Sequence, residues 1–371
     1  MSAALFTPLR LGSLTLANRI AVAPMCQYSA EDGSATDWHM VHLGHLALSG
    51  AALLFTEATA VEADGRITPA DLGLYSDDNQ AALGRVVTAI RQHSKVRLAV
   101  QLAHAGRKAS SRVPWDGGAL LLPAEGGWPT HAPSAIPQVD GEPAPRALDV
   151  PGIERITAAF AAAARRVHAL GIDAIELHSA HGYLLHQFLS PLSNTRTDAH
   201  GGSLENRMRF PLAAFEAVRR AVPESMPVGV RISATDWLEG GWDLEQSLVY
   251  AAELKRRGCT FIHVSSGGIS PRQKISIGPG YQVPFAERIK AATGLPTIAV
   301  GLITEPAQAE AIVAENRADI VALARAMLYD PRWPWHAATA LGAQVEAPPQ
   351  YWRSQPRGSK DLFGATKLGQ R

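Results

Sequence analysis

The stretch DAIELHSAHGY, residues 173–183, joins a short apolar run to three polar ring side chains. The run DAIELH has the length and character of a buried strand, so His178, His181 and Tyr183 should lie at its carboxyl end or just beyond it. In a (β/α)8 barrel this end of each strand faces the active site. Two imidazoles and a phenol in one turn can bind an oxygen atom and deliver a proton.

A single histidine at a strand end is more often a satisfied structural residue than a functional one. Here two histidines and a tyrosine converge, with Asn194 and Arg196 close by in sequence, and this convergence favours a ligand site. A zinc site would need a third protein ligand at matching spacing, and none is evident. We therefore expect no metal.

Eight apolar runs alternate with amphipathic, alanine-rich segments along most of the chain. They begin at Ile20, Ala52, Val96, Ala174, Val228, Phe261, Thr297 and Asp319. The intervening segments repeat apolar residues at three- and four-residue steps, as in GIERITAAFAAAARRVHALG from Gly152, where Gly171 is a helix stop. Eight strand–helix units predict an α/β fold, a (β/α)8 TIM barrel, with residues 1–371 forming one domain.

Three segments fall outside this repeat. Residues 1–19 contain LRLGSLTLANR, which predicts a hairpin closing the bottom of the barrel, with a simple N-terminal arm as the alternative. Residues 107–151 are rich in Gly, Pro and Trp and too long for an ordinary loop, so we expect an excursion over the active face. Residues 344–371 form a C-terminal arm that is either disordered or docked on another surface, and Tyr351 and Trp352 favour docking.

Composition excludes several kinds of partner. Lys and Arg number 35 against 34 Asp and Glu, and no dense basic run is interleaved with aromatic residues, so neither nucleic acid nor an anionic membrane is expected. Two cysteines, Cys26 and Cys259, are too few for a disulfide framework or an iron–sulfur cluster. No run approaches about 18 apolar residues. A cytoplasmic protein acting on a small molecule fits these features.

Other predicted strands also end in polar side chains. After the first run, APMCQYSAEDG places Cys26 and Tyr28 at alternate positions. We expect these two side chains to line a pocket rather than to be inert packing residues. The third run ends in Gln101 and His104, and the fifth in Arg231.

The last two runs end in Gly301 and in the pair Ala324 and Arg325. Phosphate-binding barrels hold their anion between the loops that follow these two strands. A close backbone approach at the glycine and a bidentate cation would suit a phosphate.

The segments APMCQY, DWH, QLAHAGRK, HSAHGY, SNTRTDAHGGSLENRMRF and ALARAMLYDP occur in the order in which the old yellow enzyme family carries them. The chain resembles these FMN-dependent ene-reductases over nearly its whole length. Cys26, Tyr28 and the short WRSQPR segment make it similar to the branch of thermophilic-like enzymes and xenobiotic reductase. The resemblance implies non-covalently bound FMN and NADPH as a transient reductant. No GxGxxG opens a helix after a strand, which agrees with a nicotinamide that only visits.

The resemblance also implies which residues contact the cofactor. They are Ala23, Pro24, Met25, Cys26, Ala58, Gln101, Arg231, Gly301, Ala324 and Arg325. Cys26 would lie near the C4 carbonyl and N5 and tune the flavin, while Arg231 would face N1 and the C2 carbonyl. Gln101 would hydrogen-bond the pyrimidine ring. The phosphate would be held by the last three residues, although the family often has Gly where Ala324 stands.

For the substrate, the resemblance implies that His178 and His181 donate hydrogen bonds to the oxygen of an enone, enal, maleimide or nitro compound. Hydride would pass from the flavin to the β-carbon while Tyr183 protonates the α-carbon in a ping-pong cycle, and these three residues with Cys26 would form the catalytic group. Tyr28 would add a hydrogen bond to the ligand. Trp352, on the arm, would border the pocket of a neighbouring subunit in a homodimer or homotetramer.

Three other interpretations stay open. A dienoyl thioester reductase-like flavoenzyme would need an iron–sulfur cluster and a further flavin domain, against which the cysteine count and chain length weigh. A flavin-free phosphate-binding lyase or isomerase would place a catalytic Lys or carboxylate at a strand end, where His, Gln and Arg stand instead. A non-catalytic ligand-binding barrel would leave Tyr183 without a purpose.

Overall fold

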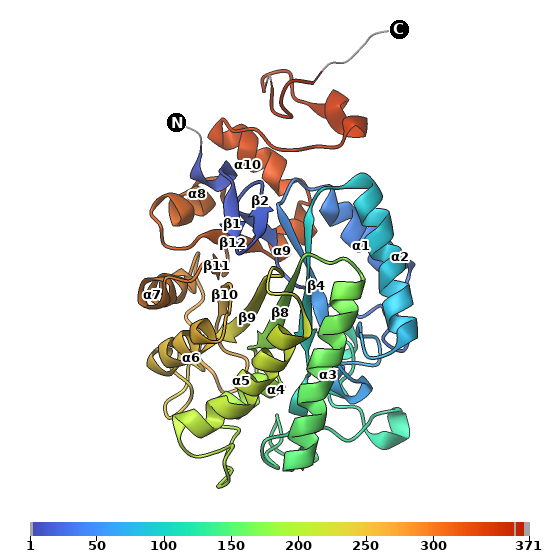
Figure 1. Ribbon diagram of the computed structural model, residues 1–371, viewed down its shortest axis with the longest axis vertical. Helices are drawn as coiled ribbons and strands as arrows, with labels where there is room; N and C mark the ends of the chain where they lie inside the picture. Colours follow the sequence, from blue (N-terminus) through green and yellow to red (C-terminus); the bar gives the residue numbers. More distant parts are fainter. Residues whose placement is uncertain (1–2, 360, 367–371) are drawn as a thin grey trace.

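Eight parallel strands close into a barrel in the computed structural model, which describes residues 3–359 and 361–366 (Figure 1). The strands are β3 (Ile20–Val22), β4 (Leu53–Ala60), β5 (Arg97–Ala103), β8 (Ala174–Ser179), β9 (Val228–Ser233), β10 (Ile262–Ser265), β11 (Thr297–Ala299) and β12 (Ile320–Leu323). Each lies within one of the eight predicted apolar runs, and β12 closes the ring by pairing with β3. The predicted (β/α)8 barrel is confirmed.

Helices cover the outside of the barrel. They are α1 (Asp37–Ala47), α2 (Asp77–His93), α3 (Val150–Ala169), α4 (Leu184–Leu189), α5 (Leu204–Ala221), α6 (Leu244–Arg256), α7 (Val283–Thr293), α8 (Pro306–Ala314), α9 (Arg325–Tyr329) and α10 (Trp333–Leu341). Because strands in such a barrel are covered on both faces, they consist of continuous apolar runs; all eight residues of β4 are buried. Helix α3 begins where the Asp149 side chain accepts from the Gly152 N–H, and Gly171 follows it at φ 67°, as predicted.

The N-terminal segment forms the predicted hairpin after a short 3-10 turn, Ala4–Phe6. Strand β1 (Leu9–Leu11) pairs antiparallel with β2 (Leu14–Leu16). Leu11 and Leu16 are fully buried and pack with Phe55 and Phe261 inside the barrel. The amino-terminal end of the barrel is therefore filled with apolar side chains.

The excursion between β5 and α3 lies at the other end of the barrel (Figure 1). It contains three short 3-10 turns and the two paired strands β6 (His131–Ala132) and β7 (Arg146–Ala147); the turns are Gly106–Lys108, Pro114–Asp116 and Pro123–Glu125. A further turn, Ala63–Gly65, follows β4. Trp115 packs edge-on against Tyr28, with ring centroids 5.7 Å apart, so the excursion reaches the loop after β3.

The C-terminal segment lies at the end of the barrel that carries the N-terminus, away from the excursion (Figure 1). It contains a 3-10 turn, Pro349–Ser354, and its apolar side chains form a small cluster with α10. Residues 360 and 367–371 of the predicted arm lie outside the described residues. None of the helices in the described part of the chain is long and apolar enough to cross a bilayer.

Candidate active site

A cavity of about 220 Å³ lies at the carboxyl ends of the barrel strands. Five residues predicted to contact the cofactor line it, and they come from four strand ends: Ala23, Arg231, Gly301, Ala324 and Arg325. Gly301 has φ +117°, and a Cβ there would lie 3.0 Å from Gln282 Nε2, so a side chain would be strained and would crowd this wall. The closed barrel thus brings together a set of residues spread over the whole sequence.

Arg231 is the most unusual member of this set. Its guanidinium is buried, its Nε has no hydrogen-bond partner, and the described residues include no ion pair to it. Burial lowers the pKa of Arg231, and Glu176 is the strongest opposing influence. A buried cation without a partner is costly, so its donor fork is available for an acceptor that the chain itself does not supply.

Gln101, also predicted, lies on β5 opposite Ala58 of β4, another predicted contact. Its Nε2 donates to Glu176 Oε1 at 2.7 Å, and Glu176 Oε2 in turn pairs with His263 Nδ1 at 2.8 Å. The Gln101 Oε1 makes no hydrogen bond to any described residue, so it is available as an acceptor. Our sequence reasoning missed Glu176 and His263, although an acid inside the apolar run DAIELH was a visible signal.

The loop after β3 carries Cys26 and is held from below by a buried, hydrogen-bonded pair, Glu57 and His39. The backbone N–H of Gln27 donates to Glu57 Oε2 at 2.6 Å, while Glu57 Oε1 lies 2.8 Å from His39 Nε2. Burial raises the pKa of the Cys26 thiol well above its usual value, so Cys26 is a protonated thiol rather than a nucleophile.

Three other predicted residues of this loop, Pro24, Met25 and Tyr28, differ in burial and backbone conformation. Pro24 is half-buried, and Met25 packs against the main core. Tyr28 has φ 51°, an uncommon conformation for a non-glycine residue. Its ring borders a second cavity of about 180 Å³ under the excursion.

The two predicted histidines hydrogen-bond within the protein. His178 Nδ1 accepts from the Ala180 N–H at 3.2 Å, which places its proton on Nε2, 3.3 Å from His181 Nδ1. His181 Nε2 then donates to Ser265 Oγ at 2.7 Å. Burial, reinforced by the charge of Arg231, lowers the pKa of both histidines well below its usual value. Both are neutral, and their N–H groups face protein atoms.

Tyr183 stands edge-on to His178, with ring centroids 4.8 Å apart. Burial raises the pKa of Tyr183 well above its usual value, so the phenol keeps its proton. Lys108 Nζ lies 5.0 Å from the centre of the Tyr183 ring and donates to the His181 carbonyl at 2.9 Å. Burial and the neighbouring Arg107 lower the pKa of Lys108 to about 8. Lys108 lies in the segment QLAHAGRK, but its position here was not predicted.

The turn that carries these side chains is unusually constrained. His181 has φ 56° and Gly182 φ 73°, and a Cβ on Gly182 would lie 2.1 Å from the Gly268 carbonyl oxygen. The Gly182 N–H donates to His186 Nδ1 at 2.9 Å, and His186 Nε2 lies 2.9 Å from Asp236 Oδ1. These contacts fix the turn in one conformation.

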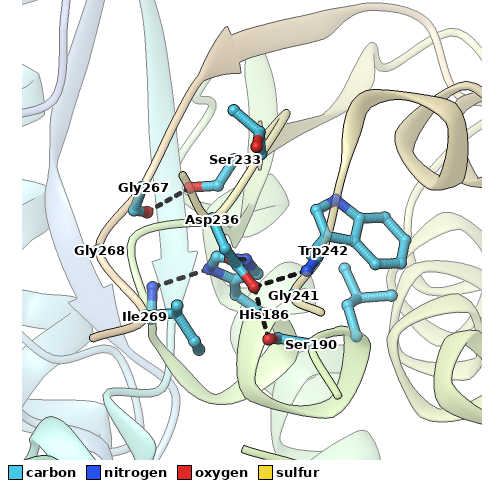
Figure 2. Close-up of polar contacts among 12 residues, drawn as sticks. His186, Ser190, Ser233, Asp236, Gly241, Trp242, Gly267, Gly268 and Ile269 are labelled. Carbon is cyan, nitrogen blue, oxygen red and sulfur yellow. Dashed lines mark hydrogen bonds and ion pairs between the residues drawn. The ribbon is translucent and has the colours of Figure 1, made fainter. Parts of the chain in front are cut away.

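A polar network behind the turn supports it (Figure 2). Asp236 Oδ2 accepts from Ser190 Oγ at 2.6 Å and from the Trp242 N–H at 2.7 Å. The His181 N–H donates to Ser233 Oγ. The Ser233 hydroxyl donates in turn to the Gly267 carbonyl at 2.7 Å (Figure 2). Loops after β8, β9 and β10 are therefore tied together beneath the predicted substrate residues.

Two expected contributors lie elsewhere. Asn194 and Arg196, which seemed to favour a ligand site, are structural: Asn194 donates to the Phe188 carbonyl, and Arg196 donates to the Pro133 and Leu148 carbonyls of the excursion. Arg196 thus anchors the excursion to the loop after α4.

Trp352 also lies away from the site of its own chain. Its indole N–H donates to the Ala347 carbonyl at 3.0 Å, and it borders a crevice of about 690 Å³ near Gly50 and Arg97, at the amino-terminal ends of β4 and β5. Within one chain, the predicted substrate contact of Trp352 is not made.

The sequence matches, over residues 4–344, a family described as NADH:flavin oxidoreductase / NADH oxidase. An NADH:flavin oxidoreductase of Gibberella zeae is 43% identical, with 96% of this chain and 91% of the relative aligned. An NADPH dehydrogenase of Geobacillus thermodenitrificans is also 43% identical, over 95% of this chain and 99% of the relative.

Solved structures with a similar fold include two other reductases. A morphinone reductase aligns with a TM-score of 0.75 at 30% identity, covering 99% of this chain and 95% of its own. A 2-naphthoyl-CoA reductase in complex with 2-naphthoyl-CoA aligns with a TM-score of 0.82 at 24% identity over 92% of this chain. The present chain spans about half (53%) of that protein, and at this identity the likeness concerns the fold alone.

Proposed function

The chain belongs to the NADH:flavin oxidoreductase / NADH oxidase family, and we propose that it reduces the activated C=C bond of α,β-unsaturated carbonyl or nitro compounds. Members of this family are FMN enzymes of the old yellow enzyme type that use a nicotinamide reductant. The observation that carries this proposal is the juxtaposition of neutral His178 and His181 with protonated Tyr183 in one rigid turn. Such a turn offers hydrogen-bond donors and a proton but no nucleophile, which suits polarisation and protonation of an alkene.

The cofactor cavity fits FMN on its own chemistry. The pyrimidine edge of the ring offers carbonyl and nitrogen acceptors and one N–H donor, and the unpaired Arg231 donors and the free Gln101 acceptor complement them. At the far side, Gly301, Ala324 and the exposed Arg325 would hold the phosphate. Cys26, Ala58 and the loop residues Ala23, Pro24 and Met25 would line the ring.

When bound, FMN accepts two electrons from the nicotinamide and passes them to the alkene. His178 and His181 would bind the substrate oxygen through imidazole N–H groups and draw electron density from the double bond. Because these N–H groups face His181 and Ser265 in the present structure, binding requires an exchange of partners. Tyr183 holds a proton at its Oη for the α-carbon, and Tyr28 would add a hydrogen bond to the ligand. NADPH and the alkene would use the same pocket in turn.

We also infer that Trp352 serves a second copy of the chain in a homodimer or homotetramer. This rests on its position at the opposite end of its own barrel, where it cannot reach its own site. Truncation after Ala347, followed by light scattering and turnover measurements, tests the idea. A truncated monomer with unaltered turnover would refute it.

The alkene-reduction proposal is tested in two half-reactions. The purified protein should release FMN on denaturation, be bleached anaerobically by NADPH, and regain its colour when cyclohexenone or a maleimide is added. Bleaching by NADPH without recovery by any activated alkene would leave a flavin oxidoreductase but remove the ene-reductase assignment.

A further inference from the structure

A belt of four polar residues crosses four adjacent strands inside the barrel. Gln101 on β5 is the register partner of Glu176 on β8, and Arg231 on β9 is the register partner of His263 on β10. Gln101 is 2% exposed, and Glu176 and His263 are fully buried. Two of the four, Gln101 and Arg231, are cofactor-site residues, whereas the other two have no assigned role.

Within this belt, Glu176 determines which atoms of its neighbours act as donors and which as acceptors. As a carboxylate, Glu176 can only accept, so the Gln101 amide must turn its Nε2 toward Glu176 Oε1, at 2.7 Å. The Oε1 of Gln101 is thereby fixed as an acceptor facing away from Glu176. His263 Nδ1 occupies the second carboxylate oxygen at 2.8 Å. An uncharged group in place of Glu176 could donate as well as accept, and the Gln101 amide could then turn over.

The charged residues of the belt also act on one another electrostatically. Arg231 has no ion pair among the described residues, and Glu176 is the acid that acts on it most strongly. Burial lowers the pKa of His263, which leaves Glu176 as the uncompensated charge of the pair. The buried Nε2 of His263 has no partner, so nothing further neutralises this carboxylate from that side. One negative charge therefore stands behind Arg231, a buried cation of the cofactor cavity.

We infer that Glu176 is a positioning residue of the flavin site: it orients the Gln101 amide so that its oxygen faces the ring, and its charge opposes Arg231 in setting the midpoint potential. The inference rests on FMN binding at this cavity, as proposed above. A negative charge near the ring disfavours the reduced, more negatively charged cofactor. Removing that charge raises the potential, and freeing Gln101 weakens binding.

Glu176→Gln tests both effects, because it removes the charge with almost no change in volume. We expect the ratio of reduced to oxidised FMN at fixed potential to rise at least tenfold, which is about 30 mV for a two-electron couple. FMN affinity should fall several-fold. Thr297→Val is the matched control, since Thr297 is fully buried on β11 and its hydroxyl has no partner. That variant should change neither quantity.

Glu176→Asp separates orientation from charge and serves if Glu176→Gln does not fold. It keeps the charge but shortens the side chain, so FMN affinity should fall while the potential moves by less than half the shift of Glu176→Gln. Wild-type protein that binds no FMN would defeat the proposed function itself. If wild-type protein binds FMN but Glu176→Gln changes the ratio of reduced to oxidised FMN at fixed potential by less than twofold, only the role of Glu176 is overturned. Unchanged FMN affinity in Glu176→Asp would do the same.

Discussion

The cofactor cavity and the turn that carries His178, His181 and Tyr183 are neighbours, but they differ in whether their polar groups have partners. In the cavity, the Arg231 Nε has no partner in the described chain, and neither has the Oε1 of Gln101 on β5. In the turn, His178 and His181 bond to each other and onward to Ser265. On the proposed function, this difference reflects how long each ligand stays. A resident cofactor pairs permanently with groups that lack a partner, whereas a substrate that comes and goes needs a turn that is stable without it.

This contrast has an energetic consequence. A buried, unpaired guanidinium costs several kcal/mol until a ligand pairs with it, so FMN binding should be coupled strongly to folding stability. The turn already satisfies its own donors, so substrate binding exchanges hydrogen bonds and gains little from each one. Substitutions in the two regions should therefore differ in what they change.

Tyr183→Phe should have the largest effect, and only on the turn. Without the phenolic proton the alkene step should slow by about 10² to 10⁴-fold, while reduction of the flavin by NADPH changes little. Stopped-flow measurement of each half-reaction separates the two steps. Equal slowing of both would mean that Tyr183 only supports the fold of the pocket.

Arg231→Met should act on the cavity. Loss of charged donors to the ring should weaken FMN binding roughly a hundredfold, about 3 kcal/mol, measured by titrating apoprotein with FMN. Arg325→Met is the comparison, because Arg325 is exposed and its phosphate contact should be worth only about tenfold. A larger loss in Arg325→Met would place the binding energy at the phosphate instead.

The exchange of partners in the turn predicts opposite effects at two contacting residues. His181→Ala should weaken phenol binding about tenfold, since it removes a donor. Ser265→Ala should leave phenol binding equal or up to about tenfold tighter, since it removes the acceptor that competes for the His181 N–H. Phenol titrations at matched FMN content decide between them, and weaker binding in both variants would refute the exchange.

The smallest effect concerns pH. The pKa of Lys108 is lowered to about 8 from an ordinary value of 10.5, so between these values the unfolded chain binds more protons than the folded one. The free energy of unfolding contributed by Lys108 should therefore rise with pH from about 8 to 10.5. Denaturant unfolding of wild type and Lys108→Met across this range isolates the contribution, and parallel pH curves would show that the Lys108 pKa is not lowered.

The barrel was predictable because strands covered on both faces must be continuous apolar runs, and eight such runs are visible in the sequence. Strand ends such as Arg231 and His178 could be placed because parallel strands direct their carboxyl ends to one face. Partner choice could not be predicted in the same way. The pairing of Glu176 with His263, and of Lys108 with the His181 carbonyl, depends on register between segments distant in the chain.

On the proposed function, Arg231 stays without a partner until FMN binds, and the stability of the apoprotein tests this most directly. Arg207 is the matched control, because it is equally buried but hydrogen-bonded through all three nitrogens. In denaturant unfolding of FMN-free protein, Arg231→Met should be as stable as wild type or more stable by about 1–2 kcal/mol, whereas Arg207→Met should lose about 3 kcal/mol. Added FMN should then stabilise wild type far more than Arg231→Met. An Arg231→Met apoprotein destabilised as much as Arg207→Met would contradict the account.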